Sequence, residues 1–342
     1  MRWDFGPRSA TLAILPAPAS RGGLKLIRAG ITAASRNPCG LEPKGIEPMA
    51  RRFVTLDVFT DQKLAGNPLA VVRDAEGLDT AAMQAIAAEF NLSETVFVLP
   101  PTDARQRARL RIFTPRHELP FAGHPTVGSA VLLALEDPSQ GDARAFGLEE
   151  RIGIVPCVVE TLSDGSGGRA RFKLPALPEF LGAGPDPAVL APLLGLEPGD
   201  LGTGRHVPSR HGVGPSFTCV PVATVAALDA ARSAPAPEAQ DGLYLYAPDP
   251  EGTGQSWRVR MFAPHLGIAE DPATGSAAAA FAGVLMQFET LGEGTHDVAI
   301  RQGEAMGRPS AIALQLTIAA GALRSVEIGG SAVIVSDGTL RV

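Results

Sequence analysis

Reactive side chains on which many enzymes depend are scarce in this sequence. It has three cysteines, Cys39, Cys157 and Cys219, an odd number with no CxxC pair and no spaced histidine partners. A disulfide framework or a zinc site is therefore not expected, and a reducing cytoplasm is the simpler setting. His206 and His211, five residues apart, are too weak a pair to predict a metal site. The four lysines lie outside every motif described below, which argues against Schiff-base chemistry.

Signatures of nucleotide, protease and hydrolase sites are also missing. The sequence has no GxGxxG after a strand, no GxxxxGK[ST], no HExxH and no GxSxG. Each of these motifs places a backbone or side-chain group that its chemistry requires, so those classes of site have no support here. We therefore predict neither a metal nor a cofactor.

Long hydrophobic runs and an excess of positive charge are absent as well. The best apolar stretches, Val131 to Leu135 and Ala277 to Leu285, are much shorter than the roughly 18 to 20 residues that cross a membrane. The net charge is −6, and because residues 1–48 carry seven basic and three acidic side chains, the remainder is near −10. Phosphate binding needs clustered Lys and Arg, so we expect neither a membrane nor nucleic acid as a partner.

The first 48 residues mix Pro, Gly, Arg and Ser without a sustained period. Their apolar pieces are too short for the core of a signal peptide. We interpret residues 1–48 as a disordered extension or an upstream start artefact, with Met49 opening the domain. An Arg-rich transit peptide is the alternative.

The remaining length suits about two domains, and the chain contains one stretch twice. Leu110 to Leu135 reads LRIFTPRHELPFAGHPTVGSAVLLAL, and Val259 to Leu285 reads VRMFAPHLGIAEDPATGSAAAAFAGVL. The shared positions are Arg109-x-Arg111-x-Phe113-x-Pro115 with Arg258-x-Arg260-x-Phe262-x-Pro264, and Pro125-x-x-Gly128-Ser129-Ala130 with Pro272-x-x-Gly275-Ser276-Ala277. Each copy leads from a strand into an Ala-rich helix.

Periodicity predicts the elements around these two copies. Strands are expected at 53–59, 69–72, 94–99, 107–113, 151–161, 169–173, 213–222, 242–247 and 256–262, and helices at 79–90, 123–135, 223–231 and 273–287. The last part, 297–342, is expected to hold strands separated by turns at Gly307, Gly321, Gly329-Gly330 and Asp337-Gly338.

Strands that lead twice into a single Ala-rich helix predict an α+β fold of two similar lobes, each a rolled, mostly antiparallel sheet around a central helix. We expect the N-terminal lobe at 49–174 and the C-terminal lobe at 175–331, with the Pro-rich passage 175–198 as linker. The final strand near 332–342 is a candidate to return to the N-terminal lobe.

The starts of the two central helices are the first candidate binding site. Backbone N–H groups at 127–129 and at 274–276 would form two positive helix ends, each suited to a carboxylate. Gly123, Gly275 and Ser276 would then line the place where substrate lies. The alternative is ordinary helix capping, which a single copy would favour, whereas two copies flanked by Gly-His-Pro and Glu-Asp-Pro favour a site.

Three titratable residues are candidates for proton transfer. Glu94 precedes the apolar strand that continues with Thr95, and partial burial there would raise its pKa toward neutrality. Taken alone, it is better explained as a solvated glutamate at a strand end. His124 can donate a hydrogen bond or carry a proton, or it is a capping or core histidine. Asp271 has the sequence position of a helix N-cap, a role that is compatible with catalysis.

The motifs together resemble those of the PhzF-like phenazine biosynthesis family, whose members share the two-lobed diaminopimelate-epimerase-like fold. The resemblance spans Phe53 to Val342 and leaves out residues 1–48. The matching runs are Asp57-Val58-Phe59-Thr60, Gly66-Asn67-Pro68-Leu69-Ala70-Val71-Val72, Leu92-Ser93-Glu94-Thr95, Arg111-x-Phe113-Thr114-Pro115, Phe121-Ala122-Gly123-His124-Pro125-Thr126 and Glu270-Asp271-Pro272-Ala273-Thr274-Gly275-Ser276-Ala277.

The resemblance implies roles for single residues. Glu94 matches the glutamate that moves the proton, His124, Asp271 and Ser276 match residues grouped around it, and Asn67 matches a substrate-facing asparagine. Cysteine-dependent epimerases of this fold place one thiol at each helix opening. No cysteine lies at 121–129 or at 267–277, so a two-thiol mechanism is excluded.

Three functional hypotheses follow. The first is a cofactor-independent isomerase acting on a small carboxylate-bearing substrate, for which the family's best-known reaction is isomerisation of trans-2,3-dihydro-3-hydroxyanthranilate. The second is an epimerase of amino-acid-like substrates that uses Glu94 with Asp271 or His124, and the third is a binding protein without turnover. The resemblance also implies a homodimer, and the cysteine usage a cytoplasmic location.

Overall fold

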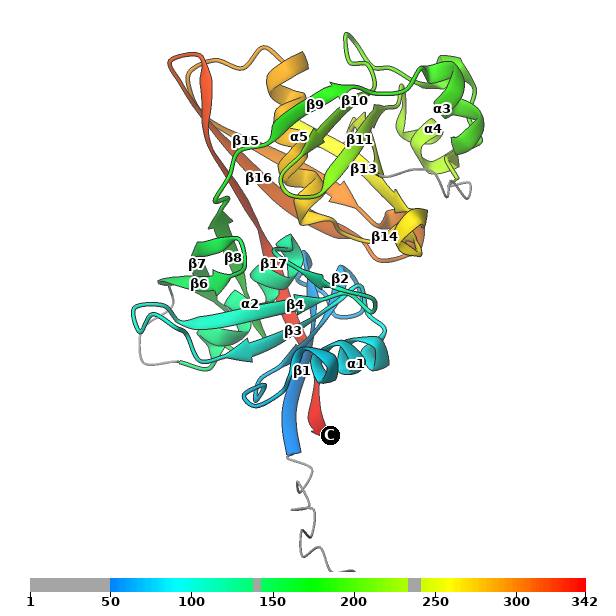
Figure 1. Ribbon diagram of the computed structural model, residues 1–342. Coiled ribbons are helices and arrows are strands. Elements are labelled where there is room, and N and C mark those ends of the chain that lie inside the picture. The colour runs from blue at the N-terminus through cyan, green and yellow to red at the C-terminus, as the bar shows by residue number, and fades with distance from the viewer. Residues whose placement is uncertain (1–49, 138–142, 233–240) are drawn as a thin grey trace, which may run out of the picture. The chain divides into compact units, whose positions relative to one another are not determined.

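Strands of the first lobe wrap around one helix (Figure 1). The computed structural model describes residues 50–137, 143–232 and 241–342, so the expectation for residues 1–48 lies outside the described residues. The elements of this part are β1 (Ala50–Val58), β2 (Asn67–Val72), α1 (Thr80–Phe90), β3 (Glu94–Leu99), β4 (Ala108–Phe113), β5 (Glu118–Leu119), α2 (Gly123–Leu135), β6 (Ala143–Glu150), β7 (Gly153–Thr161) and β8 (Gly167–Lys173).

The second lobe follows the same plan around a second helix. Its elements are β9 (Glu179–Ala183), α3 (Pro187–Leu194), η2 (Pro198–Asp200), β10 (Ser209–Gly212), β11 (Ser216–Pro221), α4 (Val225–Ala230), β12 (Gly242–Pro248), β13 (Gln255–Ala263), η3 (Pro264–Leu266), β14 (Ile268–Asp271), α5 (Gly275–Phe288), β15 (Gly294–Gln302), η4 (Glu304–Met306), β16 (Ser310–Ala319) and β17 (Ala322–Arg341).

Strand pairing repeats between the lobes. In the first lobe β1–β2 is antiparallel, β2–β3 parallel, β3–β4 antiparallel and β4–β6 parallel. In the second lobe β10–β11, β11–β12, β12–β13 and β13–β15 show the same succession of directions. The long strand β17 pairs with β16, then with β8 and β1, and so closes the first sheet around α2. The α+β architecture of two similar lobes, predicted from the duplicated stretch, is confirmed.

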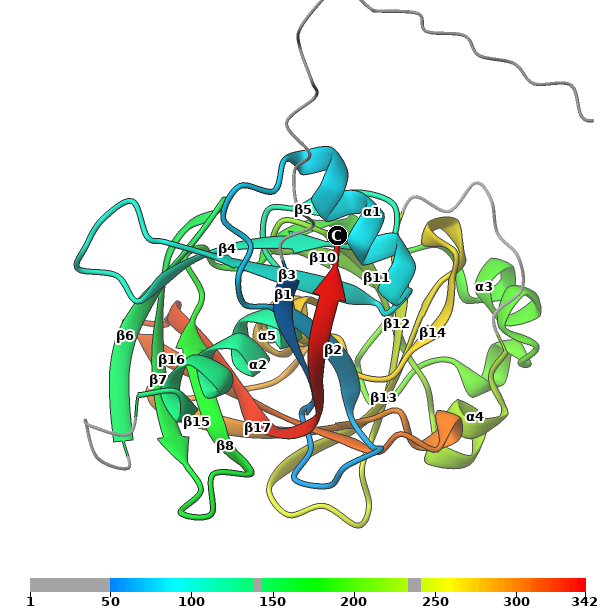
Figure 2. The same cartoon turned by 90° about the horizontal axis from the view of Figure 1, so that it is seen from below.

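The two central helices owe their position to their composition. Helix α2 carries no charged side chain, and every residue from Gly123 to Ala134 is buried. Helix α5 begins with Gly-Ser and four alanines and is buried along nearly all its length. A helix that is apolar on every side belongs inside a core, and small side chains let the surrounding strands approach it. Figure 2, which looks at the ribbon from below, shows both helices enclosed by strands.

Two of the predicted turns are wrong, because β17 runs unbroken through them. Gly329-Gly330 and Asp337-Gly338 lie inside this strand, and none of these glycines has a positive φ. Their small size serves close approach instead. A Cβ at Gly330 would lie 2.4 Å from the ring of Phe59, and one at Gly338 would lie 2.7 Å from the ring of Phe53.

The Pro-rich passage 175–198 is more structured than the predicted linker. It contains β9 and α3. Asp186 caps α3 by accepting from the Ala188 amide at 2.8 Å, and Pro187 occupies the first turn, where proline is favoured. Strand β6 was not predicted, whereas α2 and β3 have the expected bounds.

A buried carboxyl holds the first turns of α2. The Thr126 hydroxyl lies 2.7 Å from the Ala122 carbonyl and 2.7 Å from Glu150 Oε1. Thr126 is the donor in both contacts, and its bond to Glu150 lowers the pKa of that carboxyl. Burial raises the pKa by more, to about 8. Glu150 therefore holds its proton to a higher pH than an ordinary glutamate.

Replacing Glu150 with Gln should change how stability depends on pH. Because the folded state raises the Glu150 pKa from 4.5 to about 8, it binds the proton more tightly than the unfolded state. This carboxyl therefore costs stability as pH rises through that window, by up to about 1.4 kcal/mol per pH unit. Urea unfolding at pH 5, 6.5 and 8 should show E150Q gaining on the wild type as pH rises. Parallel stability curves for the two proteins would contradict the assignment.

Candidate active site

The N-termini of α2 and α5 meet at two glycines. A Cβ built on Gly123 would lie 2.7 Å from the Gly275 Cα and 3.3 Å from the Ser276 amide nitrogen. A Cβ built on Gly275 would lie 2.9 Å from the Gly123 Cα and 3.4 Å from the His124 amide nitrogen. Only glycine permits this approach, which brings the first N–H groups of both helices to one place.

These two helices differ from the outer helices in how they are capped. A side chain caps α1 (Asp79), α3 (Asp186) and α4 (Thr224). Among the described residues, the N-cap side chains of α2 and α5 make no such hydrogen bond, and only the N-cap amide of α5, that of Thr274, donates to a side chain, Gln302. Unpaired amides at a helix N-terminus attract an anion, so ordinary capping does not explain the Gly-rich starts.

The position of the free amides corrects one prediction. Residues 127–129 were expected to form the open end of α2, but the helix begins at Gly123, and Thr126 already donates its amide to the Ala122 carbonyl at 3.3 Å. Residues 127–129 therefore lie inside the helix. At the first turn of α2 the amides of Gly123 and His124 take their place.

The structure also shows which residues the two copies share. Arg111 forms two hydrogen bonds to Glu118, at 2.7 and 2.8 Å. Arg260 forms the same pair with Glu270, at 2.8 Å each. Each arginine also lies over a phenylalanine ring of its own strand, with centroid distances of 5.1 and 4.9 Å. The corresponding segments are thus Glu118-Leu119-Pro120-Phe121-Ala122-Gly123-His124 and Glu270-Asp271-Pro272-Ala273-Thr274-Gly275-Ser276.

Glu94 stands as the first residue of β3, next to His124. Its Oε2 lies 3.4 Å from His124 Nε2, and its side chain keeps 16% of its surface exposed. Burial, and secondly the negative charge of Asp271, raise the pKa of Glu94. A carboxyl in this state can hold and release a proton near neutral pH.

His124 is a neutral histidine. Only 4% of its surface is exposed, and burial lowers its pKa to about 3. Its Nε2 makes no hydrogen bond with the residues that the structure describes. At pH 7 it therefore faces Glu94 as an uncharged imidazole.

Asp271 is the last residue of β14, and its carboxylate accepts hydrogen bonds from three side chains. Its Oδ1 accepts from Asn67 Nδ2 at 3.0 Å and from Ser93 Oγ at 3.3 Å, and its Oδ2 accepts from the Thr274 hydroxyl. Burial raises its pKa, while the three donors oppose that shift. Because Glu94 receives no such donors from the described residues, Asp271 keeps the negative charge and Glu94 the proton.

The predicted N-cap role of Asp271 is wrong. Thr274 occupies the N-cap position of α5, and Asp271 lies a turn earlier, where it binds side chains from the other lobe. Ser276, in the first turn of α5, is half-buried, and its hydroxyl has no hydrogen bond with another described residue.

Two residues of this cluster, Ser93 and Gln302, were not predicted as site residues, and of Thr274 only the backbone amide was. Ser93 lies next to the predicted Glu94, so proximity in sequence could have suggested it. Gln302 could not be found in that way. It is 1% exposed, and its amide donates to the Asp271 carbonyl at 2.8 Å and accepts from the Thr274 amide at 3.1 Å.

Comparison with known proteins shows the family of this chain. Residues 56–338 match the family PhzC-PhzF, described as phenazine biosynthesis-like protein. The chain belongs to this phenazine biosynthesis-like family. The resemblance noted from the sequence motifs is confirmed, and the chain is an isomerase.

Individual members of the phenazine biosynthesis-like family are similar over nearly their whole length. An uncharacterized isomerase of Mesorhizobium japonicum is 47% identical over 85% of this chain and 98% of its own. The trans-2,3-dihydro-3-hydroxyanthranilate isomerase of Pseudomonas aeruginosa is 37% identical over 84% of this chain and 98% of its own. The crystal structure of a PhzF-family protein from Bacillus anthracis superposes with a TM-score of 0.76, at 23% identity, over 86% of this chain and 100% of that protein.

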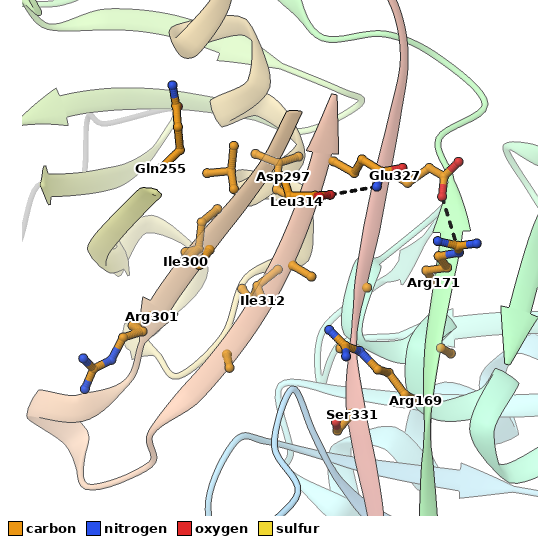
Figure 3. A pocket seen from close by; sticks show the side chains of 18 of the residues that line it. Arg169, Arg171, Gln255, Asp297, Ile300, Arg301, Ile312, Leu314, Glu327 and Ser331 are labelled. Atoms are coloured by element: carbon orange, nitrogen blue, oxygen red, sulfur yellow. Dashed lines mark hydrogen bonds and ion pairs between the residues drawn. The ribbon is translucent and has the colours of Figure 1, made fainter. Parts of the chain in front are cut away.

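A groove in this family member lies away from the helix starts. It has a volume of about 920 Å³ and lies over β8, β15, β16 and β17, where Arg171 pairs with Glu327 (Figure 3). None of Glu94, His124 and Asp271 lines it. The candidate active site of this phenazine biosynthesis-like protein is therefore the cluster at the two helix starts.

Neither metal-binding clusters nor membrane helices occur in the described part of this family member. No group of three or more His, Cys, Asp or Glu side chains is arranged there to hold a metal ion. None of the described helices combines the length and apolar character that a membrane crossing needs.

Proposed function

We propose that the protein is a cofactor-independent isomerase that moves a proton on a small carboxylate-bearing substrate, with Glu94 as the acid and base. The observation that carries this proposal is the position of Glu94. A carboxyl whose pKa is raised by burial lies 3.4 Å from a neutral His124, beside the joined starts of two helices. Such a carboxyl can take a proton from carbon and return it to another atom of a conjugated system.

The helix starts would bind the carboxylate of the substrate. The amides of Gly123 and His124 and those of Gly275 and Ser276 have no side-chain cap. Two positive helix ends that meet at one place favour a single anion more than either end alone. Ser276 has a free hydroxyl beside them, and Asn67 is held at the same place by Asp271.

Of the other two candidates, Asp271 would act on the proton of Glu94 and His124 on the substrate. Burial and, secondly, ionised Asp271 keep the pKa of Glu94 high, so that Glu94 can both release and regain the proton near neutral pH. His124 offers the unpaired Nε2 to a polar group of the substrate. The name of the Pseudomonas aeruginosa relative suggests a substrate of the dihydrohydroxyanthranilate type.

Deuterium uptake from solvent tests this proposal. Cyclic and amino-acid-like carboxylates are incubated with the wild type in D₂O, and product is analysed by NMR. We expect deuterium at carbon together with a moved double bond. Inversion of configuration without double-bond movement would favour the epimerase, and ligand-induced thermal stabilisation without any exchange would favour a binding protein.

Removing every cysteine should leave this exchange unchanged. Cys157 and Cys219 are buried in the core, where burial raises the pKa of both thiols. Neither lies in the segments that form the helix starts. The triple variant C39A/C157A/C219A is compared with the wild type for exchange at pH 7. Loss of exchange in a variant with native circular dichroism would show that a thiol takes part.

A homodimer and a cytoplasmic location complete the proposal. Light scattering during gel filtration measures the first, and fractionation of the source cells measures the second.

A further inference from the structure

One segment of the second lobe contacts the backbone of Asp271 and the residues that precede Asn67. We call residues 302–308 the strap: it runs from Gln302 at the end of β15, through η4, to Arg308. At its first end the side-chain amide of Gln302 forms hydrogen bonds to both sides of the turn before α5. Its Nε2 donates to the Asp271 carbonyl, and its Oε1 accepts from the Thr274 amide. Its Nε2 also lies 3.0 Å from Thr274 Oγ1.

The other end of the strap holds the loop that leads into β2 at Asn67. Arg308 Nε donates to the Gly66 carbonyl at 2.8 Å, and Nη2 donates to the Ala65 carbonyl at 2.6 Å and to Asp57 Oδ1 at 2.5 Å. The Gly66 amide in turn donates to the Pro309 carbonyl at 3.1 Å. The residue that follows Gly66 is Asn67.

The strap is short and closed on itself, so its two ends are coupled. The Arg308 amide donates to the Gly303 carbonyl at 3.0 Å. A Cβ at Gly303 would lie 2.3 Å from the Arg308 oxygen and 2.6 Å from the Pro272 oxygen, so the strap packs against the turn before α5. A shift of Arg308 therefore moves the Asn67 loop relative to that turn.

We propose that Arg308 is a positioning residue that holds Asn67 against Asp271 during the proton transfer. Arg308 acts from outside the cluster, and the inference rests on the proposed function. The guanidinium group of Arg308 donates to three oxygens, those of Ala65, Gly66 and Asp57. The single ammonium group of lysine cannot reproduce this arrangement of donors. Without the hydrogen bonds from Arg308, Asp271 loses the hydrogen bond that Asn67 Nδ2 donates to it.

Kinetics of Arg308→Lys test the role in the reaction. We expect kcat/KM to fall by about 10²-fold, the cost of a misplaced site residue. We also expect the acidic limb of the pH profile to move to lower pH. Asp271 without the Asn67 donor is more readily protonated, and a neutral Asp271 no longer raises the pKa of Glu94. A purely structural role would lower the melting temperature and leave the limb in place. The matched control is Arg52→Lys, which alters an exposed two-bond pair with Asp74.

A double-mutant cycle separates action through Asn67 from an independent effect. If Arg308 works through Asn67, the combination N67A/R308K loses no more activity than N67A alone. Additive losses would overturn the inference. Should R308K fold poorly, Asp57→Asn removes the charge that Arg308 binds and keeps an oxygen for the Leu64 amide. For D57N we expect the acidic limb of the pH profile to move in the same direction by a smaller amount.

A measurement without turnover keeps this inference distinct from the proposed function. The sequence has three asparagines, Asn37, Asn67 and Asn91, so ¹⁵N-asparagine labelling gives three side-chain amide signals, and N67A identifies one. The Asn67 amide donates to Asp271 and to the Ala273 carbonyl, so its hydrogens should exchange slowly with solvent. We expect faster exchange in R308K and no change in R52K. If hydrogen exchange of the Asn67 amide is unchanged in R308K, the inference about Arg308 is wrong. If only the isomerase proposal is wrong, the wild type shows no deuterium uptake into any substrate of the screen.

Discussion

Replacing Glu94 with Gln is expected to lower solvent-deuterium exchange into the substrate by about 10²- to 10⁴-fold, the usual contribution of a general acid or base. Gln keeps the shape of the side chain and cannot take a proton from carbon. KM should change little, because the helix amides that bind the carboxylate are untouched. The measurement is exchange followed by NMR, with kcat and KM from steady-state assays.

The control and the pH dependence make this test specific. Glu89→Gln alters an exposed glutamate on α1 and should leave the rate unchanged. For the wild type, kcat/KM should rise with pH as Glu94 ionises, at a pH above the ordinary carboxyl range, because burial and Asp271 raise its pKa. His124, with a pKa lowered to about 3, is neutral throughout and adds no limb there. Asp271→Asn should move the Glu94 limb to lower pH. Full exchange in E94Q would show that another group transfers the proton.

Local sequence patterns predicted where the helix α2 and the strand β3 begin, and both starts carry candidate site residues. The apolar run and its Gly-rich start placed α2 at Gly123–Leu135, as the structure has it. The boundary between a helix stop and an apolar strand placed Glu94 at the first residue of β3. The roles assigned to Glu94, His124 and Asp271 stay predictions, but the structure does place these three close together.

The alignment of the two copies of the repeated stretch was harder to predict. Matching identical residue types aligned Gly128-Ser129 with Gly275-Ser276, although these residues do not occupy equivalent positions in the two lobes. Gly128-Ser129 reads like Gly275-Ser276, yet the residue that meets Gly275 is Gly123. The reliable guide is the pair of Arg–Glu contacts, in which Glu118 and Glu270 precede their helices by the same five residues. Those contacts depend on pairing of β5 with β4 and of β14 with β13, which the sequence does not display.

Long-range contacts account for what remained hidden. Gln302 is 28 residues from Thr274 along the chain, and Arg308 is 242 residues from Gly66. No periodicity or motif at either position points to its partner. Their importance follows only once β15 and β16 bring the strap beside the helix start.

Gly275→Ala should disable the protein although alanine is the better helix former. Gly275 has no positive φ, so alanine by itself would favour the helix by about 1 kcal/mol. Its Cβ would instead lie 2.9 Å from the Gly123 Cα and 3.3 Å from the Gly123 carbonyl carbon. Both are backbone atoms that cannot rotate away. The two helix starts must separate, which we expect to cost about 1 to 3 kcal/mol of stability and about 10²-fold or more in kcat/KM.

The paired glycine decides between a local clash and a general weakening of α5. Gly123→Ala meets the same obstacle from the other side, so G123A and G275A should have similar effects, and the double variant should lose less than their sum because one separation relieves both. Gly199→Ala, where a Cβ would meet nothing within 4 Å, serves as control. If G275A melted higher than the wild type and kept its exchange rate, close contact between the helix starts would not be needed for activity, and the shared carboxylate site would have to be abandoned.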